Sequence, residues 1–328
     1  MKIAVVMGGY SDESVISLKS GQLILANLDA AKHQLYEVHV LNEGWFALVN
    51  GIKYTINKGD FSFIMDNEPI VFDVVLNTVH GTPGEDGHLQ AYWDLIGVKY
   101  AGCSSYQSAL TFNKRDTLSV LSKFGIKMAK SIYVTQGEDI DAEKVAAELG
   151  LPFMVKPNQS GSSLGISKVY KVEDLEEALR LAFLEDKDIL MEHFLKGTEV
   201  SVGIVRYKDQ TKVLGVTEIV SENDFFDYEA KYLGKSKEIT PARISDEIMQ
   251  VVQSEAKKVY ETLAMKGFAR MEFILVDNQP HFIEINTNPG LSPASIFPQQ
   301  AEFAKIPMGD LLENEIQMAL QRKTIWQK

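Results

Sequence analysis

The sequence predicts an α/β chain, with an N-terminal parallel sheet domain followed by two units of mixed α+β type. Up to about residue 110, short apolar runs alternate with helical patterns, the rhythm of a parallel sheet. Strand signals then flank a small polar loop between residues 153 and 169. Paired strand signals surround the clearest helix, at 246–265. The expected units are residues 1–112, 113–197 and 198–328.

In the first unit, a buried strand is expected over residues 3–7, where Gly8 and Gly9 end an apolar run. Ser11 and Asp12 are candidate caps for the helix that follows. Further strands are expected at 35–41 and 71–79. Ligands of parallel sheets bind beyond the carboxyl ends of the strands. The loops at 8–13 and 80–87 therefore become candidate binding loops.

The middle unit is expected to contain a helix at 114–124, a strand at 153–156, a strand at 166–169, a helix at 173–185 and a strand at 189–194. The loop at 158–165 is small, polar and rich in glycine, so its backbone N–H groups can approach a phosphate. Its spacing matches neither a Walker loop nor a dinucleotide fingerprint. A plain hairpin turn is the alternative, and Lys156 beside the loop favours a polyphosphate site.

The last unit is expected to pair strands at 199–206 and 211–219, and at 269–276 and 281–286, with Ser245 capping the helix between them. Side chains two residues apart share one face of a strand, so Arg270 and Glu272 point together, as do Glu284 and Asn286. If the strands pair antiparallel, these oxygen donors suit Mg²⁺. The alternative is a surface salt-bridge network, and the apolar neighbours of Glu284 argue against it.

Composition excludes several classes of protein. The chain of 328 residues is 45% hydrophobic and 24% charged, with 33 Lys and Arg against 45 Asp and Glu. The net charge of −12 argues against a general nucleic-acid or anionic-membrane binder. One cysteine, Cys103, excludes an internal disulfide framework and a Cys-rich zinc site. The sequence shows neither a signal peptide nor a membrane span, so we expect a cytoplasmic location.

Several separate motifs resemble those of the D-alanine–D-alanine ligases of the ATP-grasp superfamily. These are the glycine turn after residue 7, the segment 80–91, Lys156-Pro157 with 161–165, the segment 228–232, and the run from Glu284 to Gly290. The resemblance extends over nearly the whole chain. It implies that the two later units form the two-domain ATP-grasp fold.

The resemblance also implies a reaction. ATP would phosphorylate the carboxylate of one D-alanine, and the amine of a second D-alanine would attack the resulting D-alanyl phosphate. The dipeptide would serve as a peptidoglycan precursor. ATP and D-alanine would be the partners, with two Mg²⁺ ions, or Mn²⁺, as the cofactor. Family members suggest a homodimer.

Roles follow from the resemblance residue by residue. The residues implied for ATP are Lys114, Lys156, Ser162, Ser163, Glu192, His193, Phe194, Leu195, Glu199 and Lys231. The lysines at 114 and 156 would hold phosphates, segment 192–195 would line the adenine, and Glu199 would bind the ribose. The implied metal ligands are Glu272, Glu284 and Asn286.

The remaining roles concern the amino acids. The implied catalytic residues are Glu13, Ser162, Tyr232, Arg270, Gly290 and Ser295. Glu13, together with His80, would bind the first substrate and meet its ammonium in a group with Ser162 and Tyr232. Arg270 and the Gly290 N–H would stabilise the oxyanion, and Ser295 would bind the second carboxylate.

The sequence departs from the family pattern at three places, and three other functions remain as alternatives. Position 272 is Glu where Asp is usual, the loop carries Gln159-Ser160 where Arg or Glu often stands, and 14–16 lacks the usual polar pair. The alternatives are a ligase that makes D-alanyl-D-lactate or D-alanyl-D-serine, an ATP-grasp kinase, and a non-catalytic nucleotide-binding regulator. The Lys231-Tyr232 pair argues against the lactate type, and the intact metal carboxylates argue against the regulator.

Overall fold

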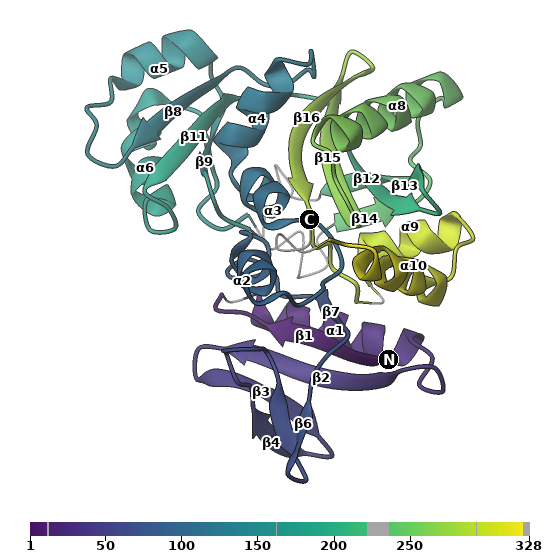
Figure 1. Cartoon of the computed structure of the whole chain (residues 1–328). Coiled ribbons are helices and arrows are strands. Elements are labelled where there is room, and N and C mark those ends of the chain that lie inside the picture. The colour runs from purple at the N-terminus through teal and green to yellow at the C-terminus, as the bar shows by residue number, and fades with distance from the viewer. Residues whose placement is uncertain (12, 162, 222–235, 293, 324–328) are drawn as a thin grey trace.

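The computed structural model describes residues 1–323 except 12, 162, 222–235 and 293. Its sheets lie in three groups around a common centre (Figure 1), with the N-terminal strands below, the middle of the chain above on one side, and β12–β16 above on the other. The mixed α/β architecture confirms the predicted fold class.

The N-terminal sheet has the strand order β4-β3-β2-β1-β7. Its centre is parallel, as predicted, because β1 pairs in parallel with both β2 and β7. At one edge, β3 and β4 add antiparallel strands that the sequence did not predict. These strands are β1 (Lys2–Gly8), β2 (Gln34–Leu41), β3 (Gly44–Val49), β4 (Ile52–Thr55) and β7 (Val74–Asn77).

Helix α1 (Ser14–Asn27) follows the glycine turn and packs on β1. Its N-cap residue is Glu13, so the prediction that Ser11 caps the helix is wrong. The Ser11 hydroxyl instead lies 3.5 Å from the carbonyl oxygen of His80, and Asp12 falls outside the described residues. Ser11 thus links the two predicted binding loops.

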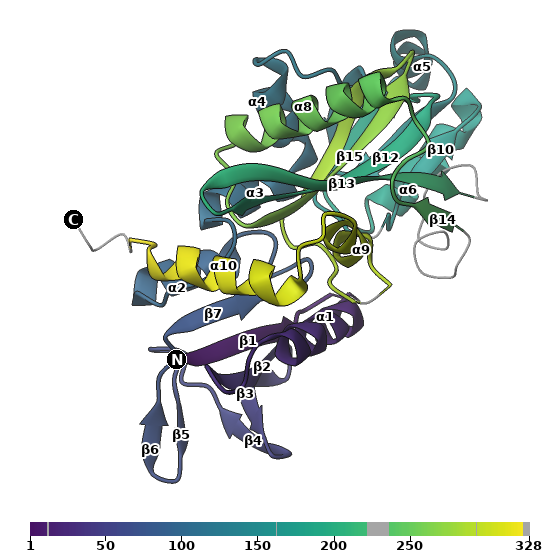
Figure 2. The same ribbon diagram turned by 90° about the vertical axis from the view of Figure 1, so that its right-hand side faces the viewer.

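The rest of this unit carries little sequence periodicity. A hairpin of β5 (Phe63–Met65) and β6 (Glu68–Ile70) extends from the sheet, and α2 (His88–Ile96) and α3 (Ser105–Phe112) lead to the next unit (Figure 2). Helix α3 begins with a capping box, in which Ser104 and Gln107 each accept a hydrogen bond from the other's backbone N–H.

The middle of the chain forms a sheet of order β10-β9-β11-β8, antiparallel at each pairing, with α5 and α6 packed on it. The predicted helix at 173–185 is shorter than expected, because its start is a 3₁₀ turn at Val172–Asp174. The elements are α4 (Lys114–Ser122), β8 (Ser131–Thr135), α5 (Ala142–Leu149), β9 (Phe153–Pro157), β10 (Ser167–Val169), α6 (Leu175–Ala182) and β11 (Asp188–His193).

The C-terminal sheet has the order β14-β13-β12-β15-β16 and is antiparallel. Helices α8 and α9 lie on its opposite sides (Figure 2). The Ser245 side chain caps α8, as predicted. The elements are β12 (Thr198–Tyr207), β13 (Gln210–Ser221), β14 (Ser236–Ile239), α8 (Asp246–Thr262), β15 (Phe268–Val276), β16 (Gln279–Asn286), α9 (Ile296–Phe303) and α10 (Met308–Leu320).

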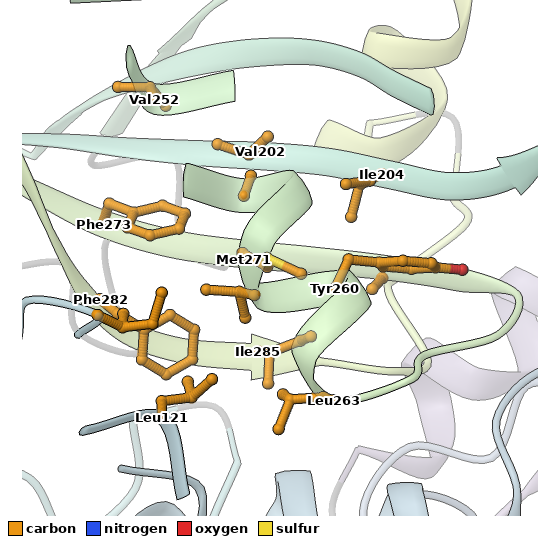
Figure 3. Close-up of a cluster of buried hydrophobic side chains, with 14 of the residues drawn as sticks. Leu121, Val202, Ile204, Val252, Tyr260, Leu263, Met271, Phe273, Phe282 and Ile285 are labelled. Atoms are coloured by element: carbon orange, nitrogen blue, oxygen red, sulfur yellow. The ribbon is translucent and has the colours of Figure 1, made fainter. Parts of the chain in front are cut away.

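The largest core cluster lies between α8 and this sheet. Figure 3 shows Val252, Tyr260 and Leu263 of the helix facing Met271 and Phe273 of the sheet. Met271 and Phe273 alternate along β15 with Arg270 and Glu272, so the apolar residues fill the core while the polar residues face the other side. The core thereby fixes the polar face of β15. Within the described ranges, no helix is long and apolar enough to cross a membrane.

Candidate active site

Two cavities lie between the groups of elements: the larger is lined by all three groups, and the smaller by the middle and C-terminal groups. The larger has a volume of about 340 Å³ and is lined by Glu13, His80, Lys114, Arg270, Asn286 and Ser295, among others. The smaller has a volume of about 110 Å³ and is lined by residues of β9, β11 and β15. Glu284 lines both cavities. The structure thus brings the residues predicted for substrate and for nucleotide into adjoining spaces.

Strands β15 and β16 pair antiparallel, which is the condition on which the predicted magnesium site depends. Glu272 pairs with Glu284, and Arg270 pairs with Asn286. A β-bulge shifts the register next to Glu272, so that Phe273 pairs with Phe282 and Ile283 is the extra residue. Ile283 and Glu284 both line the smaller cavity as a result. The bulge places an apolar wall and a carboxylate side by side on one strand.

Each carboxylate of the pair is close to a cation. Arg270 Nη2 donates to Glu272 Oε1 at 2.9 Å, and Lys114 Nζ lies 3.5 Å from Glu284 Oε2. Glu272 is 5% exposed, so it is buried with its charge partner. Asn286 Oδ1 accepts a hydrogen bond from the Asn288 N–H at 2.9 Å, which orients the amide.

This donor set fits magnesium. Glu272 and Glu284 stand on facing positions, and Asn286 follows two residues further along β16. Their carboxylate and amide oxygens are hard ligands, and water and phosphate can complete the shell. Among the described residues, no three His, Cys, Asp or Glu side chains cluster closely enough to hold a metal. The chain itself therefore supplies part of such a shell, as is usual for magnesium bound with a nucleotide.

The smaller cavity contains most of the residues predicted for ATP, whereas Lys114 lines the larger one. The smaller cavity is lined by Lys156, Ser163, Glu192, His193, Phe194, Leu195 and Glu199. Lys156 Nζ and Glu192 Oε2 are 2.6 Å apart and buried. Burial alone would lower the pKa of Lys156, but the carboxylates of Glu192, Glu284 and Glu199 outweigh burial and raise it. Lys156 is therefore cationic where a nucleotide phosphate would lie.

The loop at 158–165 joins β9 to β10, which pair antiparallel, so it is the turn of a hairpin as well as a wall of the cavities. Asn158, which is 1% exposed, connects this loop to α4. Its Oδ1 accepts from the Arg115 N–H at 2.8 Å, and its carbonyl accepts from the Lys114 N–H. Lys114 Nζ in turn donates to the Ser160 carbonyl at 2.9 Å. These contacts hold the lysine beside the loop.

Glu13 is set against two glycines from different loops. A Cβ atom at Gly161 would lie 2.7 Å from Glu13 Oε2, and one at Gly81 would lie 3.2 Å from the same oxygen. The carboxylate therefore occupies space that only glycine leaves open. This contact joins the helix α1 loop, the 80–87 loop and the 158–165 loop at one point of the larger cavity.

His80 and Glu85 lie behind Glu13 and are both buried. Burial and the nearby Arg270 lower the pKa of His80 to about 4, so its ring is neutral at pH 7. Burial and the Glu13 carboxylate raise the pKa of Glu85 to about 8. Glu85 Oε2 accepts from the Gly81 N–H at 2.7 Å. The sequence motif contained Glu85, but nothing in its spacing indicated that it would line the cavity.

The far end of the larger cavity is formed by the start of α9. A Cβ atom at Gly290 would lie 2.9 Å from Ser295 Oγ. Among the described contacts, the Ser295 hydroxyl bonds to Ser292 Oγ at 2.8 Å rather than capping the helix. The first turn of α9 contains no acidic residue, so its N–H groups can receive a carboxylate. Sequence reasoning did not identify Ser292.

Some predicted residues cannot be placed. Ser162, Lys231 and Tyr232 lie outside the described residues. Every other predicted site residue lines one of the two cavities.

Comparison with known proteins finds matches over nearly the whole chain. The family model described as D-ala D-ala ligase N-terminus matches residues 2–103, and that described as D-ala D-ala ligase C-terminus matches residues 120–317. The D-alanine--D-alanine ligase of Flavobacterium psychrophilum is 65% identical over 328 residues, covering 100% of both chains.

Solved structures agree with this result. The VanG D-Ala:D-Ser ligase of Enterococcus faecalis is 28% identical with a TM-score of 0.87, covering 97% of this chain and 99% of that one. The D-alanine--D-alanine ligase of Bacillus anthracis, complexed with ATP, is 27% identical with a TM-score of 0.79, covering 98% of each chain.

Proposed function

The chain belongs to the D-alanine–D-alanine ligase family, and from this premise we infer that it joins two D-alanine molecules using ATP. The observation that carries this inference is the shared position of Glu284. A phosphoryl group must pass from the nucleotide to an amino-acid carboxylate, so the two substrates must meet. Glu284 lines both the smaller cavity, which we assign to the nucleotide, and the larger cavity, which we assign to the amino acids.

In the first step, the carboxylate of one D-alanine attacks the terminal phosphorus of ATP, releasing ADP and leaving D-alanyl phosphate. Glu13 would hold the ammonium of this D-alanine, because its carboxylate faces the larger cavity between two glycines. Lys114 and Lys156 would hold phosphate oxygens at the boundary of the cavities. Both cations reduce the repulsion between two anionic reactants.

Glu272, Glu284 and Asn286 would hold the metal ions, and their paired register supports this assignment. When bound, magnesium supplies positive charge that offsets the charge building up on the transferred phosphoryl group. We propose two ions, with manganese as a possible substitute.

In the second step, the ammonium group of the second D-alanine loses a proton, and the resulting amine attacks the carbonyl carbon of D-alanyl phosphate. A tetrahedral intermediate forms, and phosphate leaves with the electrons of the broken C–O bond. Arg270 and the Gly290 N–H would stabilise the oxyanion, because both line the larger cavity. The start of α9, with Ser295, would hold the second carboxylate.

Family membership also indicates the pathway, the cellular location and the oligomeric state of the chain. The dipeptide would enter peptidoglycan precursor synthesis in the cytoplasm, and the chain would act as a homodimer. These three points rest on family membership alone.

One experiment tests the proposed reaction. The purified chain is incubated with ATP, magnesium, D-alanine, D-serine and D-lactate together, and the products are identified by mass spectrometry. We expect D-alanyl-D-alanine as the main product, with one phosphate released per dipeptide. A predominance of D-alanyl-D-serine or D-alanyl-D-lactate would assign the chain to a sister ligase. ADP release without any condensed product would indicate a kinase.

A further inference from the structure

Glu238 lines the larger cavity and has no role in the reaction described so far. It lies on β14, where it pairs with Ile219 of β13, and Ile219 pairs with Glu199 of β12. Directly paired residues in an antiparallel sheet point to the same face. Glu238 therefore shares the face of the sheet from which Glu199 reaches the smaller cavity.

A contact with α9 locates Glu238 within the cavity. Gln299 Nε2 lies 3.5 Å from Glu238 Oε2 and donates to the Ala294 carbonyl at 3.2 Å. Ala294 and Ser295 both line the larger cavity, at the point where α9 begins. Gln299 stands four residues after Ser295, which is about one helical turn or about 6 Å of rise. The Glu238 carboxylate thus lies beside the site proposed for the second carboxylate.

The other carboxylates of this cavity are already engaged. Glu284 lies 3.5 Å from Lys114 Nζ, and Glu85 accepts from a backbone N–H in the buried loop behind Glu13. Glu13 is assigned to the first ammonium. The reaction brings two ammonium groups into the site, and none of these three carboxylates is assigned to the second of them.

Glu238 is not assigned to the metal site. Within the described part of the chain, Glu238, Glu272 and Glu284 do not form a group of three carboxylates that could hold a metal ion. The charged groups that act on it are Arg270 and Glu272 of β15. Burial raises the pKa of Glu238, and Arg270 and Gln299 offset this effect only in part. The neighbouring Arg270 therefore does not fully compensate the cost of burying the Glu238 carboxylate.

We propose that Glu238 binds the ammonium group of the second amino acid and so selects an amino acid for that position. The proposal rests on the proposed ligase function. An α-amino acid carries its carboxylate and ammonium on one carbon atom. A helix start and a carboxylate that line the same end of the cavity can hold these two groups and direct the nitrogen toward the acyl phosphate.

The test uses Glu238→Gln, which keeps the shape of the side chain and removes its charge. Initial rates are measured against D-alanine concentration, because two D-alanines bind and the curve contains a Michaelis constant for each. We expect the constant for the second D-alanine to rise about ten- to a hundredfold, the loss expected for a charge-assisted hydrogen bond. The constants for the first D-alanine and for ATP should stay within about twofold of the wild type.

Further variants separate the effect of the Glu238 charge from an effect on its contact with α9. Glu238→Asp keeps the charge and should recover part of the loss. Gln299→Leu removes the contact with α9 but leaves the carboxylate, and should change the second constant little. Glu302→Gln makes the same chemical change at an exposed position of α9 and should behave as the wild type. Melting temperatures of all variants show whether each is folded.

The outcomes are distinct. An unchanged second constant in Glu238→Gln would overturn the role of Glu238 while leaving the ligase function in place. Equal losses in Glu238→Gln and Gln299→Leu would overturn it too, because they would show that Glu238 only supports α9. Failure of the wild type to form any dipeptide would overturn the ligase function and this proposal together.

Discussion

Glu272 and Glu284 stand directly opposite each other on β15 and β16. Two carboxylates in directly paired positions repel each other unless cations intervene. Arg270 and Lys114 provide one cation each, at 2.9 and 3.5 Å. The pair is built into the sheet by the hydrophobic core on the other face of β15 (Figure 3), so its spacing does not depend on a flexible loop.

Replacing Glu284 by Gln should lower kcat by about a hundredfold or more, because it removes one charged oxygen from the shared wall of the cavities. Coupled-enzyme measurement of ADP release at saturating ATP and D-alanine checks this. Glu143→Gln, at an exposed position of α5, is the matched control. Near-normal turnover in Glu284→Gln would contradict the metal assignment.

Replacing Lys156 by Gln should weaken ATP binding and destabilise the fold. The buried Glu192 would lose its cation at 2.6 Å, and breaking a buried pair from one side costs about 3–5 kcal/mol. Urea unfolding measures the change. The double variant Lys156→Gln with Glu192→Gln should recover most of the stability, since it leaves no buried unpaired charge. If the double variant were less stable than Lys156→Gln, the ion pair would not explain the loss.

Replacing Gly161 by Ala should act on the first D-alanine. The new methyl group would lie 2.7 Å from Glu13 Oε2 and push the carboxylate away. We expect kcat/KM for the first D-alanine to fall about tenfold or more, as a misplaced substrate contact would cause. Gly59→Ala, whose Cβ would meet only Asn57, is the control. Equal kinetics for both variants would show that Glu13 does not need this position.

Glu315 of α10 gives a prediction for pH dependence. Burial raises its pKa to about 8, above the ordinary value of 4.5 for a glutamate, so between these values the folded chain holds a proton that the unfolded chain releases. Its contribution to stability is complete below pH 4.5 and is lost as the pH rises to about 8. Glu315→Gln removes this loss. Its free energy of unfolding should gain on the wild type by about 1.4 kcal/mol per pH unit across that window.

Urea unfolding of both chains at a series of pH values measures this difference. His80 acts in the opposite direction, because its pKa is lowered to about 4 and its contribution is lost as the pH falls below 6.5. It is present in both chains and cancels in the comparison. Parallel curves for the wild type and Glu315→Gln would refute the assignment.

The sequence predicted the elements that carry their own local signals. The stripe and cap of α8, and the alternation of Arg270 and Glu272 on β15, depend on residues close in the chain. The bulge at Ile283 was missed, because it breaks the alternation and arises from pairing with a distant strand. Short edge strands such as β3 and β4 were missed because a few half-buried residues give weak periodicity.

In the site too, residues with local sequence signals were predicted, and residues that depend on distant elements were not. Residues within contiguous motifs, such as Glu284 and Asn286, were found, since the motif itself is local. Glu238 and Ser292 were missed, because each becomes part of the site only when β14 and α9 fold against the cavity. The box formed by Ser104 and Gln107 was present in the sequence and would have identified helix α3.

The position of Glu284 in the wall of both cavities has a consequence for inhibitor design. A compound anchored in either chamber can be extended past this side chain toward its neighbour, because Glu284 lines both. Joining two weakly bound fragments in this way makes the second contact intramolecular, and the gain depends on how well the tether matches the span between them. The protein itself therefore sets the tether length that a two-headed inhibitor should have.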